Sequence, residues 1–323
     1  MAYKLDAIDK QIIFELDRNA RIPETKLAKK VNRSKESVRY RIKKLQEEKI
    51  LLGYRTWFDP SKLGFTSAKI YLNLSNNPKR VAEFKKYLYG EKRLFWLGIA
   101  QGAWNVGLTF YVKNNREFFD LKNDIYTKFK DIILDAKTGM LVSVHVGNLT
   151  FLTNNTSQWM TFFDSTTKKE EIDELDKKIL KILYENSKEH IINIAKKSGV
   201  TADTVRERIK KLTNNKVITR HRARIDFTKL GYEFFKTFLY FTNLTKEDEA
   251  RLMEYSRQHP NILYLIKQNS PWDVELEIMC ENYLKYNEIL DGLTKEFSDI
   301  INKVETAIMS EDYVFPRNKL IFE

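Results

Sequence analysis

The feature of this sequence that most restricts its fold is an internal repeat. Residues 5–65 align with residues 172–232 at a constant shift of 167 positions, without a gap, and 22 of the 61 pairs are identical. The most similar block reads V-R-x-R-I-K-K-L in both copies. A weaker similarity continues beyond it, where Trp104 corresponds to Trp272. The 323 residues therefore hold two copies of one unit, each long enough for two small domains.

The net charge is +12, and its position along the chain is informative. Residues 1–64 and residues 172–231 each carry a net charge of +7, so the rest of the chain is slightly acidic. Positive charge confined to two segments is typical of polyanion-binding units joined to neutral modules. No segment approaches the roughly 20 consecutive apolar residues of a transmembrane helix, and the N-terminus is charged, unlike a signal sequence. We therefore predict a cytoplasmic protein that binds double-stranded DNA and no membrane.

The two basic segments have the residue pattern of a helix-turn-helix. In the first copy, Asp6 can cap a helix with a buried aliphatic stripe, and Pro23 begins a short second helix. The next turn needs a positive φ, which Asn32 in the first copy and Gly199 in the second copy tolerate. A third helix follows in each copy.

The third helix is predicted to read DNA. Val38, Ile42 and Leu45 fall on one face, and basic side chains point outward. Such a helix fits the major groove, where Arg and Lys donate to phosphates or guanine edges. The β-prone segments that follow are predicted wings beside the phosphate backbone. The predicted DNA-binding residues are Ser34, Lys35, Ser37, Arg39, Tyr40, Arg41, Lys43, Lys44, Arg55, Thr201, Thr204, Arg206, Arg208, Lys210, Lys211 and Arg222.

These segments resemble the Lrp/AsnC family of prokaryotic, especially archaeal, transcription regulators. The resemblance rests on L-D-A-I-D-K-Q-I-I-F-E-L at the start, V-R-Y-R-I-K-K-L-Q-E-E-K-I-L in the third helix, and the link D-P-S-K-L-G-F. It implies that each winged helix is followed by a ferredoxin-like βαββαβ module, of the RAM type, that binds small effectors in many members and drives dimerisation. The predicted fold class is therefore α+β, with two winged helix-turn-helix domains that each precede a ferredoxin-like domain.

Hydropathy and turn residues independently predict the same order of elements. In the first copy the expected elements are a strand at 68–74, a helix at 78–89, strands at 94–100 and 106–112, a helix at 116–130 and a strand at 140–146. The second copy repeats the order at 236–242, 246–258, 262–267, 274–279, 283–297 and 304–310. The expected domains are 1–58 and 172–225 for the winged helices, 65–150 and 232–323 for the ferredoxin-like modules, and 151–171 for a polar linker.

The resemblance also implies an effector site near a G-x-x-D turn between the second and third strands of each module. This chain reads G-A-W-N in the first copy and S-P-W-D in the second, so neither copy has both the glycine and the aspartate. An amino acid or similar small molecule is the expected effector. The predicted effector-binding residues are Gly102, Trp104, Asn105, Ser270, Trp272 and Asp273.

Because the family's modules pair through their sheets, one chain with two modules is expected to form an intramolecular pseudo-dimer, and further assembly into a homodimer stays open. The two third helices present different side chains, which predicts an asymmetric operator. The differing residues are Lys35, Glu36 and Tyr40 in the first copy and Ala202, Asp203 and Glu207 in the second.

The predicted function is a sequence-specific transcription regulator of the Lrp/AsnC type that a small effector can modulate. Two alternatives stay open. Siroheme decarboxylases resemble this tandem arrangement, but none of the four histidines lies in an H-N-Y-x-R motif. A nucleoid-type protein that coats DNA would have a similar sequence. The single cysteine, Cys280, precludes an intramolecular disulfide or thiolate cluster, and no phosphate loop or metal-ligand spacing is present. We therefore predict no cofactor, no metal and no enzymatic activity.

Overall fold

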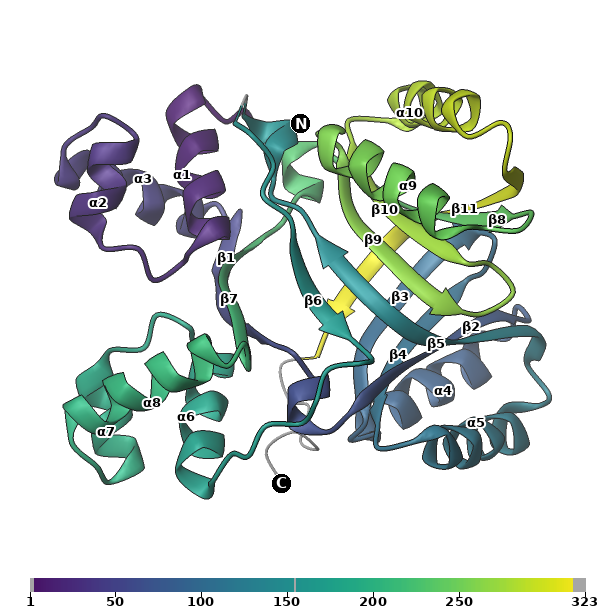
Figure 1. Ribbon diagram of the computed structural model, residues 1–323, viewed down its shortest axis with the longest axis horizontal. Coiled ribbons are helices and arrows are strands. Elements are labelled where there is room, and N and C mark those ends of the chain that lie inside the picture. Colours follow the sequence, from purple (N-terminus) through teal and green to yellow (C-terminus); the bar gives the residue numbers. More distant parts are fainter. Residues whose placement is uncertain (1–2, 154, 316–323) are drawn as a thin grey trace.

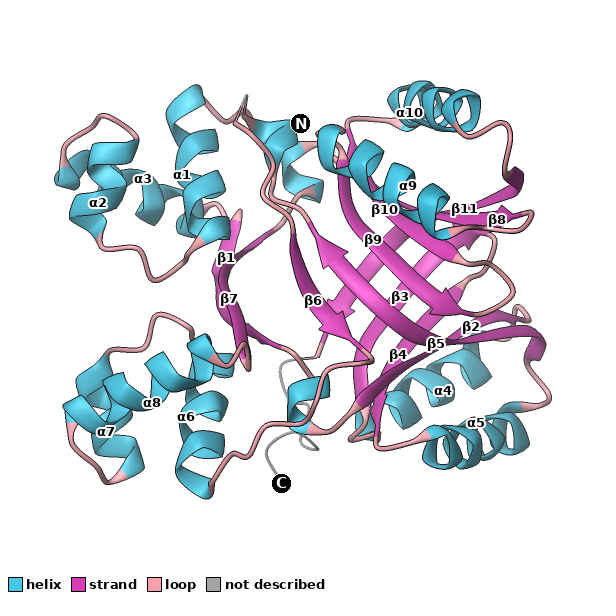
Figure 2. Cartoon of the chain, viewed as in Figure 1, coloured by secondary structure: helices cyan, strands magenta, loops and turns pink. Residues whose placement is uncertain are grey.

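The computed structural model describes residues 3–153 and 155–315. Two helical units lie on one side of the molecule, and two α+β modules lie on the other side (Figure 1). A two-stranded ribbon stands between the helical units and the modules (Figure 2). Within the described residues, no helix combines the length and the apolar character needed to cross a membrane.

Apart from β6, the described parts of the two copies contain the same helices and strands in the same order, which confirms the predicted fold class. The first copy consists of α1 (Ala7–Arg18), α2 (Glu24–Lys30), α3 (Lys35–Glu47), β1 (Leu51–Phe58), β2 (Thr66–Leu74), α4 (Pro78–Gly90), β3 (Leu94–Gly102), β4 (Val106–Val112), α5 (Asn115–Phe129), β5 (Ile133–Val146) and β6 (Met160–Asp164). The second copy consists of α6 (Glu174–Glu185), α7 (Ile191–Ser198), α8 (Ala202–Asn214), β7 (Ile218–Ile225), β8 (Glu233–Phe241), α9 (Lys246–Gln258), β9 (Ile262–Asn269), β10 (Val274–Cys280), α10 (Tyr283–Glu296) and β11 (Ile301–Val314). Short 3-10 turns lie at Ser61–Leu63, Thr150–Leu152 and Thr228–Leu230.

Local side chains begin and end the helices as predicted. The Asp6 carboxylate accepts a hydrogen bond from the backbone N of Asp9 at 2.8 Å and so caps α1. Ser34 caps α3 through the backbone N of Ser37 at 3.1 Å, and Thr201 caps α8 in the same way. The turns before these helices contain Asn32 and Gly199, whose φ angles of 51° and 74° confirm the predicted left-handed positions.

The ribbon consists of β1 and β7, which pair with each other in antiparallel orientation, so that Arg55 lies opposite Arg222. This pairing corrects the prediction of two DNA-flanking wings. Arg55 and Arg222 are only 6% and 7% exposed and lie on the side of the ribbon that faces the protein. Because neither guanidinium reaches the surface, the prediction that these two arginines bind DNA is wrong.

The two ferredoxin-like modules form one continuous sheet. Its strand order is β2-β4-β3-β11-β8-β10-β9-β5-β6, and β2 also pairs with β5. Eight strands therefore close into a ring, and β6 extends it at one edge. The predicted pseudo-dimer is present, with the two sheets facing each other across the ring and joined at both edges by β5–β9 and β11–β3 pairing.

Two strands are longer than predicted because each belongs to both modules. In β5, residues 133–140 pair with β2 of the same module, and residues 140–146 pair with β9 of the other module. β11 bridges β8 and β3 in the same manner. The expected linker 151–171 is also not wholly a linker, because it contains β6, which pairs with β5. Its side chain Phe163 is buried.

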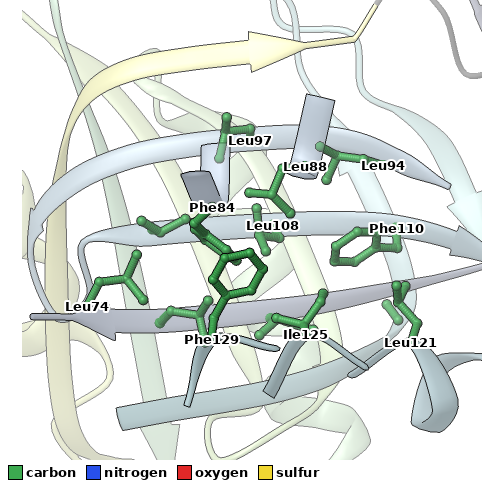
Figure 3. Packing of buried hydrophobic residues seen from close by; sticks show 14 of the residues in the cluster. Leu74, Phe84, Leu88, Leu94, Leu97, Leu108, Phe110, Leu121, Ile125 and Phe129 are labelled. Carbon is green, nitrogen blue, oxygen red and sulfur yellow. The ribbon is translucent and has the colours of Figure 1, made fainter. Parts of the chain in front are cut away.

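Helices α4 and α5 cover the outer face of the first module's sheet, and α9 and α10 cover that of the second (Figure 1). Figure 3 shows Phe84 and Phe129 close together in this core, with aliphatic side chains such as Leu97 and Leu108 nearby. Each module therefore has an apolar core on its helical side.

The inner faces of the ring contain a buried cluster of ion pairs. Glu275 Oε2 lies 2.7 Å from Lys69 Nζ, and Glu275 Oε1 lies 2.9 Å from Lys236 Nζ. Lys236 also pairs with Glu277, and the Tyr71 hydroxyl donates to Glu275 at 2.6 Å. Burial opposes ionisation of Glu275, but Lys236 and then Lys69 outweigh burial and lower the pKa of Glu275 to about 2. This carboxylate thus holds lysines from both copies together.

We expect Glu275→Gln to lower the free energy of unfolding by about 3 kcal/mol or more, because two buried lysines lose a counter-charge. Urea unfolding of the full chain measures this effect. Glu288→Gln removes a carboxylate from a pair with Lys285 whose side chains are both exposed, and we expect this control to change the stability by less than about 0.5 kcal/mol. Equal effects of the two substitutions would contradict the structural role of Glu275.

Candidate functional site

The outer faces of α3 and α8 form two exposed cationic surfaces. Each helix is anchored by two buried side chains, Val38 and Leu45 in α3 and Val205 and Leu212 in α8. The exposed side chains on the other face include Arg39, Tyr40, Lys43 and Lys44 in α3, and Arg206, Glu207, Lys210 and Lys211 in α8. The predicted division into an anchoring face and an exposed basic face therefore exists in both copies.

The exposed arginines of these faces have only weak intramolecular partners. Arg39 Nε lies 2.6 Å from Glu24 Oε2 of α2, and both side chains remain well exposed. Arg206 pairs with Asp203 one turn earlier on its own helix, again at the surface. Exposed ion pairs contribute little to stability and exchange readily, so a polyanion can replace these carboxylates. Tyr40 is 68% exposed between the basic residues of α3.

The smaller polar residues at the start of the two helices have a local role. The hydroxyls of Ser34 and Thr201 accept the capping hydrogen bonds, and Thr204 Oγ1 lies 2.9 Å from Thr201 Oγ1. Lys35 is half-buried and lies 4.0 Å from Glu24, and Ser37 is half-buried. These side chains lie beside the exposed basic faces rather than at their centres.

Two predicted DNA-binding arginines instead connect helices. Arg41 Nη1 lies 2.7 Å from Asp6 Oδ2 and 2.7 Å from Asp9 Oδ1, both at the start of α1. In the second copy Arg208 makes the equivalent contacts with Asp173 and Asp176. Hydrogen bonds that Arg41 donates to Asp6 and then to Asp9 raise the pKa of Arg41. We therefore interpret Arg41 and Arg208 as links between helices, because acidic residues of the first helix pair with both guanidinium groups, and their predicted contact with DNA stays a prediction.

The residues predicted to bind an effector are engaged within the fold. Trp104 and Trp272 are buried beside Tyr71 and Phe238, with ring centroids 4.6 to 6.4 Å apart in the contacts that involve either tryptophan. Their rings therefore have no face free for a ligand, which corrects the prediction for both tryptophans.

The polar members of the same predicted site also have internal partners. The Asn105 amide bonds the backbone of Leu74 at 2.9 and 3.0 Å, and Asp273 accepts from the backbone N of Phe241. The Ser270 hydroxyl donates to the Trp272 carbonyl. Gly102 has a φ of 118°, and a Cβ there would lie 2.3 Å from the Thr306 carbonyl oxygen. This glycine serves a close approach of two backbones.

A cavity that the sequence did not predict lies between the ribbon and the open end of the ring. Its volume is about 150 Å³. The ribbon contributes Arg55 to Phe58 from β1, and strands of both modules complete the wall. Its lining also includes Lys69, Lys236 and Glu277 of the ion-pair cluster, and Asp312. Most of the remaining lining side chains are aromatic or aliphatic.

No local motif marks this cavity, because its lining residues come from eleven elements spread over the chain. A comparison of the two copies does give a signal. Arg55 corresponds to Arg222, but Asp17, the ion-pair partner of Arg222, is replaced in the second copy by Tyr184. The sequence shows the change from Asp17 to Tyr184, and the structure shows that this change removes the carboxylate partner from the retained arginine.

The contacts of Arg41 lead to a test that separates stability from DNA binding. We expect Arg41→Gln to lower the free energy of unfolding by about 1 kcal/mol, because it breaks the link between α3 and α1. We expect little change in the salt dependence of DNA affinity. Lys43→Gln removes an exposed cation from the same helix, and its unfolding midpoint in urea should match that of the unaltered chain. A loss of DNA affinity in Arg41→Gln that exceeds the loss in Lys43→Gln would contradict this assignment.

Comparisons with known proteins identify the helical units. A family model of the AsnC-type helix-turn-helix domain matches residues 5–46 and 172–213. The regulator FL11 of Pyrococcus horikoshii is 33% identical over 122 residues, which are 37% of this chain and 78% of the relative. LrpB of Bacillus subtilis is 25% identical over 150 residues, or 44% of this chain and 99% of that protein. Both relatives are named as HTH-type transcriptional regulators.

Solved structures match the whole tandem chain. The siroheme decarboxylase NirDL, in complex with an iron-uroporphyrin III analogue, superimposes with a TM-score of 0.66 over 98% of this chain and 96% of its own, at 13% sequence identity. A second structure of NirDL gives a TM-score of 0.65. At this identity the likeness shows a shared fold.

This likeness overturns the prediction that the chain is not an enzyme. That prediction rested on the lack of an H-N-Y-x-R motif and of phosphate-loop or metal-ligand spacing in the sequence, but an enzyme shares the fold over 98% of this chain. The helical units and the relative with 78% coverage nevertheless establish the lineage: the chain belongs to the Lrp/AsnC family of transcription regulators and carries two copies of the family's unit in one polypeptide.

Proposed function

We propose that this protein is a sequence-specific DNA-binding transcription regulator that presents α3 and α8 to two successive half-sites of one operator. The observation that carries the proposal is the exposed cationic face on both helices, with Arg39 and Arg206 at equivalent positions and Val38 and Val205 buried behind them. A helix with this division of faces fits the major groove of B-DNA.

The connection between the two helical units supports joint binding. β1 and β7 pair over their full lengths, which ties the end of one unit to the end of the other. In addition, Arg21 Nη1 of the first unit donates to the Glu189 carbonyl of the second at 3.1 Å and to the Ser187 carbonyl. Because these contacts hold the units at one separation, the half-sites should be one helical turn, or a multiple of it, apart.

The two half-sites should differ in sequence. α3 exposes Tyr40 and α8 exposes Glu207 at the same position of the helix. A glutamate can accept a hydrogen bond from the cytosine amino group, and a tyrosine carries no such charge. The operator is therefore an imperfect palindrome, unlike the symmetric site of a homodimer with identical reading helices.

The test is the double substitution Arg39→Gln with Arg206→Gln. We expect the affinity for DNA to fall on the order of 2 kcal/mol or more, and the slope of log affinity against log salt to shrink by roughly 2, since two phosphate or base contacts are lost. Fluorescence anisotropy with a labelled duplex at several salt concentrations measures both quantities. The matched control is Arg116→Gln with Lys295→Gln, which removes two exposed cations from α5 and α10. Equal losses of DNA affinity in the two variants would mean that only the overall positive charge of the protein matters, and would contradict the proposed role of α3 and α8.

A footprint decides between a regulator and a protein that coats DNA. We expect protection of a discrete, imperfectly palindromic site that persists in the presence of competitor DNA. Protection that spreads continuously as the protein concentration rises would favour the architectural alternative. Either pattern can be read from one titration on genomic fragments.

A second candidate function is that of an enzyme acting on a tetrapyrrole. The observation that favours it is the fold shared with a siroheme decarboxylase over 98% of the chain, together with a cavity lined by Arg55, Lys69 and Lys236. Incubation of the protein with siroheme, followed by mass spectrometry for loss of carbon dioxide, tests it directly. Because the cavity measures about 150 Å³, a tetrapyrrole requires the ribbon to move away from the ring.

A further inference from the structure

We propose that the cavity between the ribbon and the ring binds a small aromatic carboxylate, with the carboxylate on Arg55 and the ring among the aromatic side chains. The site is distinct from the turn at Gly102 and Ser270 where an effector was expected from the sequence. The cavity contains no residue of α3 or α8. Ligand binding in the cavity can therefore be tested independently of DNA binding.

Arg55 carries a positive charge that is largely buried. Arg55 is only 6% exposed, and within the described residues no carboxylate pairs with it. Its Nη2 donates to the Val314 carbonyl at 3.3 Å, and its guanidinium lies 5.4 Å from the centroid of the Tyr184 ring. Burial lowers the pKa of Arg55. A largely buried guanidinium that lacks a counter-charge is stabilised when an anion joins it.

Arg222 occupies the position equivalent to Arg55 in the second copy and lies opposite Arg55 in the ribbon. Arg222 Nε lies 2.6 Å from Asp17 Oδ1, and its guanidinium also contacts Tyr264. The repeat places Tyr184 where Asp17 stands in the other copy. Within the part of the chain that the structure describes, Arg222 has an internal carboxylate partner and Arg55 has none, and of these two arginines it is Arg55 that lines the cavity.

The other charges around the cavity are already matched. Lys69 pairs with Glu275, and Lys236 pairs with both Glu275 and Glu277. Asp312 accepts a hydrogen bond from the Trp96 indole, and it lies close enough to act on Arg55 by charge. Among the described residues of this wall, Arg55 is thus the cation that lacks a carboxylate partner. A ligand on it must carry negative charge and must avoid Asp312.

The size and the remaining lining define the rest of the ligand. A cavity of about 150 Å³ has room for a molecule of roughly one benzene ring. Phe58, Phe95, Tyr111, Phe163 and Phe234 contribute aromatic surface to its wall. Offset and edge-to-face contacts with these rings favour an aromatic ligand, and the bidentate geometry of a guanidinium favours a carboxylate. Benzoate has both features.

The experiment measures benzoate binding to the full chain by isothermal titration calorimetry, with benzamide as the neutral analogue of the same shape. We expect benzoate to bind at least tenfold more tightly than benzamide. Arg55→Gln should abolish this preference, and Arg55→Lys should retain part of it. The control Arg116→Gln, which removes an exposed arginine of α5, should bind benzoate like the unaltered protein. Equal binding of benzoate and benzamide, or unchanged benzoate binding in Arg55→Gln, would overturn the proposal.

A second variant keeps the test valid if Arg55→Gln does not fold. Asp312 is exposed, and Asn at this position can still accept the hydrogen bond from Trp96. We expect Asp312→Asn to tighten benzoate binding severalfold, because a negative charge near the carboxylate is removed. Weaker binding in Asp312→Asn would mean that the ligand presents a positive group to Asp312, and would contradict an anion at Arg55.

Discussion

The buried ion pairs among Lys69, Lys236, Glu275 and Glu277 constrain how the two halves of this protein assemble. Both copies contribute a lysine to the inside of the ring, but both carboxylates come from the second copy, since Gly107 and Thr109 stand at the corresponding positions of the first. Two first modules facing each other would bury two lysines without a counter-charge. A buried ion pair adds little net stability compared with an apolar pair, but it penalises wrong partners. The cluster therefore specifies pairing between unlike modules, which one polypeptide guarantees.

The elements that could be predicted from the sequence are those whose determinants are local. Helix caps such as Asp6 and Ser34, and the left-handed turn at Gly199, need only neighbouring residues, and they lie where the pattern indicates. The pairing of β1 with β7 joins residues about 170 positions apart, such as Arg55 and Arg222. The sequence of each strand does not indicate which other strand it pairs with, so the sequence pattern predicts two separate wings. The full length of β5 was missed for the same reason, because its first half mixes apolar and polar residues and pairs with the distant strand β2.

The candidate sites show the same limit at the level of single side chains. Helical periodicity predicts which face of α3 is exposed, and Arg39 lies there, but periodicity does not show that Asp6 and Asp9 on another helix bind Arg41. The recurrence of both acidic residues as Asp173 and Asp176 carries that information, since a contact kept in two copies leaves paired residues in both. The cavity is indicated by a difference between the copies instead. Arg222 has the carboxylate partner Asp17, whereas the equivalent arginine, Arg55, has Tyr184 at that position.

Divergence between the two fused copies also explains how the proposed DNA contacts and the proposed ligand site can both differ between the copies. In a homodimer, replacing the carboxylate at Asp17 would unpair both arginines of the ribbon, and each would have to find another anion. In this chain the change affects only Arg55, while Arg222 stays paired and keeps the ribbon attached to α1. Arg55 lies on the strand that leads from α3 into the first module, directly opposite Arg222. An anion at Arg55 would therefore act on the one element that joins both reading helices to the ring. This placement follows from the pairing of β1 with β7 and requires no contact between ligand and DNA.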